Sequence, residues 1–311
     1  MTVSEKGVRV AIILNGLPYY RKRFYRKYFP ALNEAFPIHI FETKEALHGI
    51  QLAQAAALDS FSIVLAAGGD GTLHEVVNGV LSASAAINHQ PTIGLIPIGS
   101  GNDFARTMHL KSDVNHIIGL IRSASVRSVN VGKIVYSTAD GGSGERYFIN
   151  VADIGMGPEV VKRVASARKR LGGEVAYYKS IIETFLKFKP LTVTATTPSW
   201  KWTGKLRSLA VANGKYYGHG LCIAPDALPD DDTFDFFICG NVSVFDFIRY
   251  SGKLKHGKYL KVKHVEYKRE KKVSFTSSKQ CLIEGDGELL GVLPATVSLT
   301  DTKINFLAAD E

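Results

Sequence analysis

The first 125 residues alternate apolar runs with segments of helical periodicity. The apolar runs, rich in Val, Ile and Leu, cover residues 8–15, 38–43, 62–69 and 92–99. The segments with helical spacing lie near residues 19–35, 45–58 and 73–86. Strands that alternate with helices in this way predict a parallel sheet covered by helices on both faces. We therefore expect residues 1–125 to form an α/β domain.

The pattern changes after about residue 126. Most of the later apolar stretches are short and strand-like, for example SVNVGKIVY, LTVTATT and KVSFTS. Two helical segments interrupt them, a long basic amphipathic one over about 158–188 and a shorter one near 243–256. This pattern predicts a second, mainly antiparallel β domain over residues 126–311, and its last strand could also return to the sheet of the first domain.

Three of the predicted parallel strands end in glycine-rich or polar loops. These loops are Asn15-Gly16, Gly68-Gly69-Asp70-Gly71 and Gly99-Ser100-Gly101-Asn102-Asp103. Because the carboxyl ends of parallel strands lie at one edge of a sheet, we expect the three loops to meet there. Glycines leave room for a ligand, and a helix start offers unpaired N–H groups. The loops therefore predict an anion site suited to nucleotide phosphates.

Asp70 stands between glycines at the start of the helix predicted after the second loop. Because Mg²⁺ takes carboxylate oxygens and keeps several waters, Asp70 is a candidate for a metal network. Thr72 and Glu75 have the spacing of a capping box, in which both would bond N–H groups of their own helix, and Glu75 fits the nucleotide site equally well. In the third loop, Asp103 is the expected cap of the helix that follows.

A further glycine-rich stretch, LIEGDGELLGVLP, covers residues 282–294. Asp-Gly is a favoured pair in tight hairpin turns, and spacing alone favours that interpretation for residues 285–288. Alternatively, one carboxylate on this turn could accept the proton of a hydroxyl during phosphoryl transfer while the other orients it.

Composition and charge restrict the class of protein further. The chain has 311 residues and 45% hydrophobic content, and its three cysteines form no C-x-x-C pair, which favours a reducing compartment over a disulfide scaffold or a zinc site. No apolar run approaches the roughly 20 residues needed to span a bilayer, so we expect a cytoplasmic protein. The net charge of +9 suits nucleotide phosphates, nucleic acid or acidic headgroups. Without a nucleic-acid-binding motif, we expect no nucleic-acid partner.

Other phosphate-binding and hydrolytic motifs are not convincing. Residues 252–258 match G-x-x-x-x-G-K by letter, but Tyr259 stands where the Ser or Thr that binds Mg²⁺ belongs, and no apolar strand precedes the match. Neither H-E-x-x-H nor G-x-S-x-G occurs. Metalloprotease and α/β-hydrolase functions are therefore excluded.

Five segments, taken in order, resemble a known family. They are GGDGTLHEVVNG, IPIGSGNDFAR, YFINVADIG, APDALPDDDTFDFFI and EGDGE. The set resembles the bacterial lipid kinases with a diacylglycerol kinase catalytic domain over almost the whole chain, while GGDGT alone is shared with sphingosine kinases, NAD kinases and 6-phosphofructokinases. The resemblance implies an NAD-kinase-like N-terminal α/β domain, a C-terminal β-sandwich domain, and ATP and Mg²⁺ in the cleft between them.

The resemblance also implies roles for individual residues. The residues that would bind the nucleotide are Asn15, Thr43, Gly69, Asp70, Gly71, Thr72, Glu75, Ser100 and Asn102. Asp70 and Asp103 would join the catalytic Mg²⁺ and water network. Asp286 resembles the base for the lipid hydroxyl and Glu288 its acidic neighbour, and either could accept the proton. A structural Mg²⁺ loop would use the side chain of Asp231 and the carbonyls of Leu228 and Thr233.

This chain departs from the family pattern at three places. The first loop is Asn15-Gly16-Leu17-Pro18 where the family usually has an Asn-Pro-x-Ser-Gly type loop, which puts the phosphate contact there in question. Asn130 replaces a frequent Asp and removes a negative charge, and Asp232 replaces a loop glycine. None of these changes removes Asp70 or Asp286.

The expected function is ATP-dependent phosphorylation of a hydroxyl on a lipid such as diacylglycerol. The alternatives are a kinase of sphingoid bases or ceramide, a kinase of a soluble metabolite such as NAD, and a non-catalytic lipid- or nucleotide-binding protein. Because a lipid substrate lies in a bilayer, the protein would be peripheral at the inner membrane surface, with residues 161–170, Phe185, Leu186 and Phe188 as a candidate contact. The sequence does not decide the oligomeric state, and a homodimer is one option.

Overall fold

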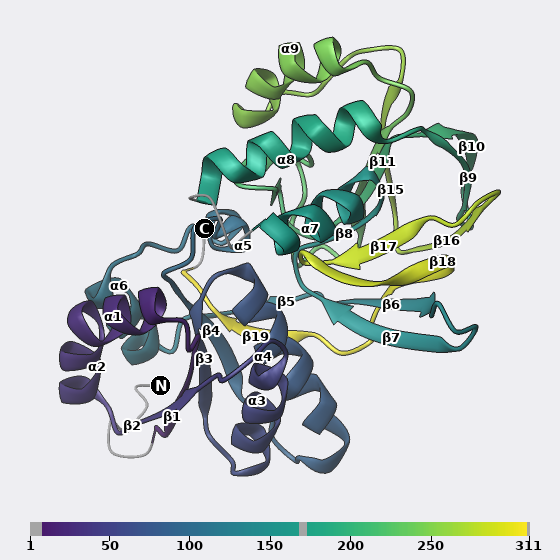
Figure 1. Ribbon diagram of the computed structural model, residues 1–311. Coiled ribbons are helices and arrows are strands. Elements are labelled where there is room, and N and C mark those ends of the chain that lie inside the picture. Colours follow the sequence, from purple (N-terminus) through teal and green to yellow (C-terminus); the bar gives the residue numbers. More distant parts are fainter. Residues whose placement is uncertain (1–7, 168–172, 310–311) are drawn as a thin grey trace. The chain divides into compact units, whose positions relative to one another are not determined.

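The computed structural model describes residues 8–167 and 173–309. The chain forms two compact units (Figure 1). The first runs from the N-terminus to Val129 and includes the C-terminal residues from Thr302 onward. The second is the intervening segment, Asn130–Asp301. One unit is therefore built from two separate stretches of the sequence.

The first unit contains a six-stranded sheet. Its strands, in spatial order, are β2 (Ile38–Glu42), β1 (Val10–Leu14), β3 (Ile63–Gly68), β4 (Thr92–Pro97), β19 (Ile304–Leu307) and β5 (Val126–Val129). Neighbours from β2 to β19 pair in parallel, and only β5 runs antiparallel to its partner β19. Every residue of β1 and β3 is buried, as expected for strands covered on both faces. The predicted α/β fold of this part is confirmed.

Helices cover both faces of this sheet. They are α1 (Pro18–Lys27), α2 (Phe29–Ala35), α3 (His48–Leu58), α4 (Asp70–Ala83), α5 (Asp103–Thr107) and α6 (Val114–Ser123), with a short 3₁₀ turn η1 (Ser84–Ala86). In Figure 1, α1, α2 and α6 lie on one side of the sheet and α3 and α4 on the other. The segment predicted near 19–35 is divided at Tyr28, since Pro30 occupies the first turn of α2. A proline there needs no N–H partner and begins a new helix.

The second unit contains an eleven-stranded antiparallel sheet. Its main path is β10 (Lys201–Leu206), β9 (Leu191–Thr196), β16 (Lys272–Ser277), β18 (Glu288–Leu299), β17 (Leu282–Gly285), β8 (Val151–Gly155), β11 (Ser208–Ala212), β14 (Phe234–Cys239) and β15 (Val265–Glu270). Off this path, β6 (Gly132–Ser137) pairs with β18 and β7 (Ser143–Phe148). Two short strands, β12 (Tyr216–Tyr217) and β13 (Leu221–Cys222), pair with each other. The predicted antiparallel β domain is confirmed.

Three helices belong to the second unit. They are α7 (Met156–Ala167), α8 (Gly173–Lys187) and α9 (Val244–Lys255). The last confirms the helix predicted near 243–256, and it begins with a capping box between Ser243 and Asp246. The long basic segment predicted over 158–188 is two helices, and residues 168–170 of the basic run lie outside the described residues. In the part of the chain described, no helix is long and apolar enough to cross a membrane.

The predicted membrane contact is only partly at the surface. Leu186 is 69% exposed, whereas Phe185 is buried and packs against Phe247 in a tilted arrangement with 5.2 Å between the ring centroids. The guanidinium of Arg207 lies 4.0 Å from the centroid of the Phe185 ring. Phe185 is therefore a core residue, and its proposed place in the membrane contact is wrong, because its helical position faces the sheet.

Candidate active site

In the first unit, the loops after β1, β2 and β3 are joined by side-chain hydrogen bonds. The Asn15 amide nitrogen donates to Thr72 Oγ1 at 3.1 Å. The backbone N–H of Gly16 donates to Thr43 Oγ1 at 3.0 Å. These bonds connect loops that are far apart in the sequence, so the first two of the three predicted loops meet at one edge of the sheet, together with the loop after β2.

Two glycines allow these loops to pack closely. A Cβ on Gly16 would lie 1.8 Å from the carbonyl oxygen of Thr43, and a Cβ on Gly99 would lie 2.5 Å from the Cα of Gly69. Both contacts involve backbone atoms, which cannot move aside as a flexible side chain can. The loop after β4 is thereby held against the loop after β3, with only glycine tolerated at the contact.

The capping-box interpretation of Thr72 and Glu75 is wrong. Helix α4 begins at Asp70 with Gly69 as its N-cap, and no side chain caps it. Thr72 lies within the first turn, so it cannot occupy the cap position. The Glu75 carboxylate instead accepts hydrogen bonds from the N–H groups of Leu47 at 3.0 Å and Gly49 at 2.8 Å, at the start of α3. Glu75 therefore caps a neighbouring helix rather than its own.

Asp70 performs a similar role for α5. Its Oδ1 accepts a hydrogen bond from the N–H of Phe104 at 3.0 Å. Asp103 is the first residue of α5 and Asn102 is the N-cap, so the expectation that Asp103 caps this helix is wrong. A Cβ placed on Gly101 would lie 3.1 Å from Asp70 Oδ2 and 3.9 Å from Asp103 Oδ2. The two carboxylates predicted to share a metal network therefore both lie close to Gly101.

The third loop also holds an unused hydrogen-bond acceptor. Asn102 adopts the left-handed conformation, with φ of 53°, and its amide nitrogen donates to the carbonyl of Gly99 at 2.9 Å. Its Oδ1 is buried and has no hydrogen-bond partner. Ser100, in the same loop, is exposed. A buried acceptor without a partner beside an exposed hydroxyl is consistent with a loop that binds a polar ligand.

In the second unit, Asp286 lies at the tip of a tight hairpin. Asp286 and Gly287 have φ values of 52° and 85° and connect β17 to β18, whose last pair is Gly285 with Glu288. Positive φ at both central residues is characteristic of a type I′ turn, for which Asp-Gly is a preferred sequence. The hairpin predicted from the spacing is confirmed. Glu288 is half-buried on the strand that follows.

The Asp286 carboxylate is buried and held by backbone N–H groups. Its Oδ2 accepts from Ile149 at 2.9 Å, and its Oδ1 accepts from Asn150 at 2.9 Å and Val151 at 3.1 Å. The N–H of Asp286 in turn donates to the carbonyl of Val151 at 2.8 Å. The start of β8 therefore fixes both the turn and the direction of its carboxylate.

Two further buried acids lie beside this turn, and the sequence analysis did not identify them. Asp153 on β8 and Glu284 on β17 are direct partners in the antiparallel register. Glu284 accepts a hydrogen bond from the hydroxyl of Tyr217 at 2.8 Å and from the N–H of Gly287 at 2.6 Å. The hydroxyl of Ser208 lies 3.0 Å and 3.1 Å from the two carboxylate oxygens of Asp153. The signal in the sequence is an acid within each of the apolar strands VADIG and LIEG.

Burial controls the acidity of both groups. Loss of hydration raises the pKa of Asp153 to about 7, although hydrogen bonds from Ser208 and Tyr217 act in the opposite direction. Burial also raises the pKa of Glu284 well above its usual value, and the charge of Asp153 adds to that effect. The pair is therefore difficult to ionise completely near neutral pH.

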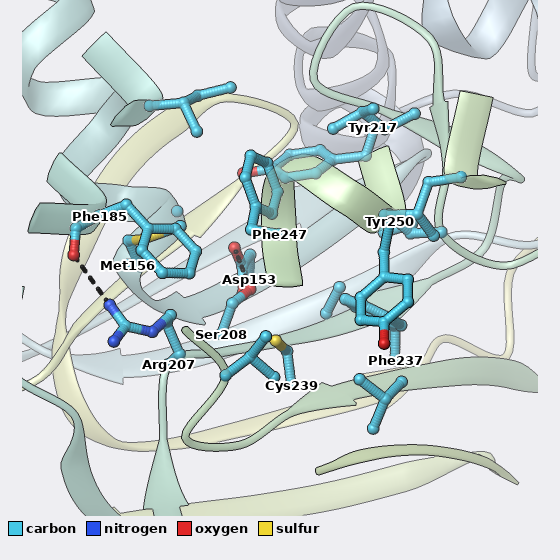
Figure 2. Close-up of a pocket in the computed structure, with 18 of the residues that line it drawn as sticks. Asp153, Met156, Phe185, Arg207, Ser208, Tyr217, Phe237, Cys239, Phe247 and Tyr250 are labelled. Carbon is cyan, nitrogen blue, oxygen red and sulfur yellow. Dashed lines mark hydrogen bonds between the residues drawn. The ribbon is translucent and has the colours of Figure 1, made fainter. Parts of the chain in front are cut away.

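Asp153 also lines an apolar pocket in the second unit (Figure 2). The pocket has an empty volume of about 860 Å³ and lies among α7, α8, α9 and the strands β8, β11 and β14. Its apolar lining includes Met156, Phe237 and Phe247. Figure 2 shows Asp153 and Ser208 near the centre of the view, between these apolar side chains. The pocket combines a large apolar wall with a small polar patch, as expected of a site for an amphiphile.

The predicted structural metal loop contains an ion pair. Asp231 accepts from the N–H of Thr233 at 3.1 Å and pairs with the guanidinium of Arg269. The carbonyl of Leu228 accepts from the N–H of Asp231 at 3.4 Å, and Asp232 has a left-handed φ of 60°. Over residues 8–167 and 173–309, no group of three or more His, Cys, Asp or Glu is arranged to hold a metal. Since Arg269 already supplies positive charge to Asp231, a structural Mg²⁺ site stays a prediction.

Comparisons with known proteins agree with this division into two units. Residues 9–134 match the diacylglycerol kinase catalytic domain family, and residues 151–308 match the YegS C-terminal NAD kinase beta sandwich-like domain family. A diacylglycerol kinase of Bacillus subtilis is 28% identical over 295 residues, covering 92% of this chain and 91% of that protein. A diacylglycerol kinase of Staphylococcus epidermidis is 30% identical over 243 residues, covering 78% of this chain and 73% of that protein.

Solved structures share the fold. A diacylglycerol kinase from Bacillus anthracis aligns with a TM-score of 0.69 at 22% identity, covering 98% of both chains. A yeast NADH kinase in complex with NADH aligns with a TM-score of 0.55 at 11% identity, covering 97% of this chain and 84% of that one. The fold therefore defines an NAD-kinase-like protein. Within that class, the chain belongs to the diacylglycerol kinase family and is a kinase.

Proposed function

We propose that this chain is an ATP-dependent lipid kinase that transfers the γ-phosphoryl group to a hydroxyl of a lipid such as diacylglycerol. The observation that carries the proposal is the apolar pocket of the second unit, because its polar patch at Asp153 is connected to the Asp286 turn. A site with this combination accommodates acyl chains and keeps a carboxylate near the polar end of the lipid. The curated relatives compared above are named diacylglycerol kinases, which supports the same acceptor.

The joined loops of the first unit would bind ATP. The start of α4 at Asp70 offers backbone N–H groups and the positive end of the helix dipole to phosphate. The close packing of Gly99 on Gly69 keeps side chains away from the backbone there. The unpartnered Oδ1 of Asn102 is an acceptor for a nucleotide or water hydrogen. The remaining residues proposed for the nucleotide are Asn15, Thr43, Gly71, Thr72, Glu75 and Ser100.

Asp70 and Asp103 would hold Mg²⁺ in the first unit. Their carboxylates both lie close to Gly101, and Mg²⁺ is commonly bound by one or two carboxylates together with substrate phosphates and water. When bound, the ion would neutralise charge on the phosphates during transfer. The contribution of the chain is to place the two carboxylates, which it does by fixing Asp70 to the start of α5.

Asp286 would act as the base in the second unit. During transfer the lipid O–H bond breaks, an O–P bond forms, ADP leaves, and the proton passes to Asp286. The backbone N–H groups of Ile149, Asn150 and Val151 hold the carboxylate in a fixed direction, which lowers the cost of reaching the reactive geometry. Glu288, half-buried next to the turn, is the alternative acceptor.

The lipid substrate requires contact with a membrane surface. Among the described side chains of α8 and α9, four large apolar ones are exposed, namely Ile182, Leu186, Phe245 and Ile248, at 41%, 69%, 81% and 54%. Exposed apolar groups on a chain with a net charge of +9 suit an anionic bilayer. Vesicle flotation with and without anionic lipid tests this contact. We expect Phe245→Ser to reduce the bound fraction several-fold, and equal binding by both proteins would remove α9 from the contact.

Transfer of label from γ-labelled ATP to a lipid panel tests the proposed function. The panel contains a diacylglycerol, a ceramide, a sphingoid base and NAD, and the proteins are wild type, Asp286→Asn and the exposed control Asp301→Asn. We expect labelled diacylglycerol with wild type and with the control, and a large loss with Asp286→Asn. Label in NAD alone would contradict the lipid assignment, label in a sphingoid base would change the acceptor, and no label in any compound would favour a binding protein.

A further inference from the structure

Asp153, Tyr217 and Glu284 form one buried hydrogen-bond network. Asp153 and Glu284 are at most 1% exposed and lie opposite each other on β8 and β17. The hydroxyl of Tyr217 donates to Glu284 Oε1 at 2.8 Å, and a Cβ on Gly157 would lie 1.8 Å from Asp153 Oδ2 and 2.9 Å from the same hydroxyl, so Tyr217 also lies close to Asp153. One hydroxyl therefore lies between two carboxyl groups.

The number of protons in this network follows from its geometry. A tyrosine hydroxyl has a single hydrogen and can donate it to only one of the two carboxyl groups. The second contact is a hydrogen bond only if the other carboxyl group carries a proton and donates it to the tyrosine oxygen. If both carboxyl groups were ionised, two like charges would lie side by side in a buried site and one contact would have no hydrogen.

The charged and titratable neighbours do not compensate a second negative charge. In the described part of the chain, the titratable groups with electrostatic interactions to Asp153 or Glu284 are other acids and thiols. They are Asp286 on the turn, Cys239 on β14 and Cys281 before β17, and Glu159 on α7 acts on Cys281. The guanidinium of Arg207, directly before β11, donates to backbone carbonyls at the end of α8 and interacts with Cys239. A shared proton is therefore the available means of neutralising the pair.

This network connects the pocket to the proposed base. Asp153 lines the pocket, and a Cβ on Gly157 in the first turn of α7 would lie only 1.8 Å from its Oδ2, so this carboxyl group is tightly enclosed. At the other end, Glu284 accepts from the N–H of Gly287, the residue directly after Asp286. A change in the charge of the pair would therefore act on the turn that carries Asp286.

We propose that Asp153, Tyr217 and Glu284 share one extra proton and act as positioning residues, which hold the Asp286 turn in its active geometry only while that proton is present. The inference rests on the proposed function, since it assigns Asp286 the role of base. It predicts that activity falls as pH rises above the range in which the shared proton is retained. Burial raises the pKa of Asp153 to about 7 and that of Glu284 well above its usual value, so the pair passes from two protons to one near pH 7 and loses the shared proton at higher pH.

Neutral variants of the two acids test the shared proton. In Glu284→Gln and Asp153→Asn, an amide N–H replaces the shared proton and cannot be lost near neutral pH. We expect the wild-type kcat to fall by about tenfold per pH unit once the pH, alkaline of 7, exceeds that at which the shared proton is lost, as for loss of one essential proton. We expect each amide variant to keep at least a tenth of the kcat at pH 6.5 and to have a flat profile to pH 8.5. A decline in both variants as steep as in the wild type would overturn the proposal.

Tyr217→Phe tests the bridge, that is, the Tyr217 hydroxyl that lies between the two carboxyl groups. Removal of the hydroxyl leaves two adjacent carboxyl groups without a connecting donor, so we expect a lower kcat at every pH and an unchanged KM for ATP. The matched control is Tyr136→Phe, a half-buried tyrosine of the same unit outside the pocket, which should keep the wild-type profile. Equal profiles for the two tyrosine variants would contradict a role for the bridge.

Thermal unfolding separates this inference from the proposed function. The wild-type Tm should fall between pH 6 and pH 8.5 as the buried pair ionises, and this fall should be smaller in Glu284→Gln and Asp153→Asn, whether or not a lipid is phosphorylated. Absence of lipid labelling with this difference in Tm would refute the kinase assignment and keep the shared proton. Lipid labelling with identical Tm profiles in all proteins would refute the shared proton.

Discussion

The tripeptide Gly-Asp-Gly occurs twice among the proposed functional residues, once in each unit, with two different structures. Gly69-Asp70-Gly71 is the junction between β3 and α4, and Asp70 is the first helical residue. Gly285-Asp286-Gly287 is a hairpin turn in which Asp286 and Gly287 both have positive φ. Identical letters therefore form a helix start in one unit and a type I′ turn in the other, because the segment that follows is helical in one case and a strand in the other.

The two aspartates also differ in what holds them. Asp70 accepts one N–H bond from Phe104 and so caps a helix that begins 33 residues later. Asp286 accepts N–H bonds from three consecutive residues, 149–151, at the start of one strand. Three consecutive backbone donors on both oxygens fix the direction of the Asp286 carboxylate, which suits a base. The bond from Phe104 holds Asp70 at the start of α5, close to Gly101 and Asp103, which suits sharing of a metal.

The largest expected effect is that of Asp286→Asn. Asparagine tolerates the left-handed conformation and keeps one acceptor oxygen for Asn150 and Val151, so the turn should be retained. Loss of a general base lowers kcat by about 10² to 10⁴. Single-turnover label transfer measures the loss of catalytic rate, and a nucleotide-binding isotherm measures the affinity for the nucleotide. We expect unchanged nucleotide affinity, and a kcat within twofold of the wild type would refute the assignment of the base.

Asp70→Asn should have a smaller effect. The amide oxygen can still accept from the N–H of Phe104, so the cap of α5 is kept while the charge is lost. We expect kcat/KM for ATP to fall about 10- to 100-fold with a higher Mg²⁺ requirement, which corresponds to a loss of roughly 1.4 to 2.7 kcal/mol. The comparison is Asp70→Ala, which also removes the cap and should lower stability by about 1 kcal/mol more. An Mg²⁺ titration equal to that of the wild type would exclude Asp70 from the metal network.

The smallest effects should come from the glycines that follow the two aspartates. Gly287 has φ of 85°, so Gly287→Ala should destabilise the second unit by about 1 to 2 kcal/mol. Gly71 lies in the first turn of α4 with ordinary helical geometry, so Gly71→Ala should raise stability by at most about 1 kcal/mol. Denaturant unfolding of both variants shows whether each substitution lowers or raises the free energy of unfolding. The same sign for both would show that the two tripeptides are not as different as their φ values indicate.

The sequence was sufficient for the first four strands of the first unit, β1 to β4, and for the loops that follow them. Apolar runs such as residues 62–69 can only be buried in a covered sheet, and their carboxyl ends must then share an edge. The local helix starts were less accurate, because capping depends on tertiary neighbours. Glu75 lies three residues after Thr72, yet its carboxylate bonds Leu47 and Gly49, which no local pattern indicates.

The network of Asp153 and Glu284 could not be predicted in the same way. The two acids are 131 positions apart in the sequence and become neighbours only through the register of β8 and β17. Each acid alone within an apolar strand indicates a buried polar group that needs a partner. Which partner it finds depends on the pairing of strands that are not consecutive, and this pairing is set by the whole sheet.

The position of β19 has a consequence for the synthesis of the protein. This strand, Ile304–Leu307, lies between β4 and β5, although the whole second unit precedes it in the sequence. During translation the second unit is therefore available to fold before the sheet of the first unit has its fifth strand. A ribosome that stalls after residue 301 would leave β4 and β5 unpaired with each other, with two open edges that favour aggregation. Completion of the proposed nucleotide-binding unit thus depends on a strand that is synthesised after the whole second unit.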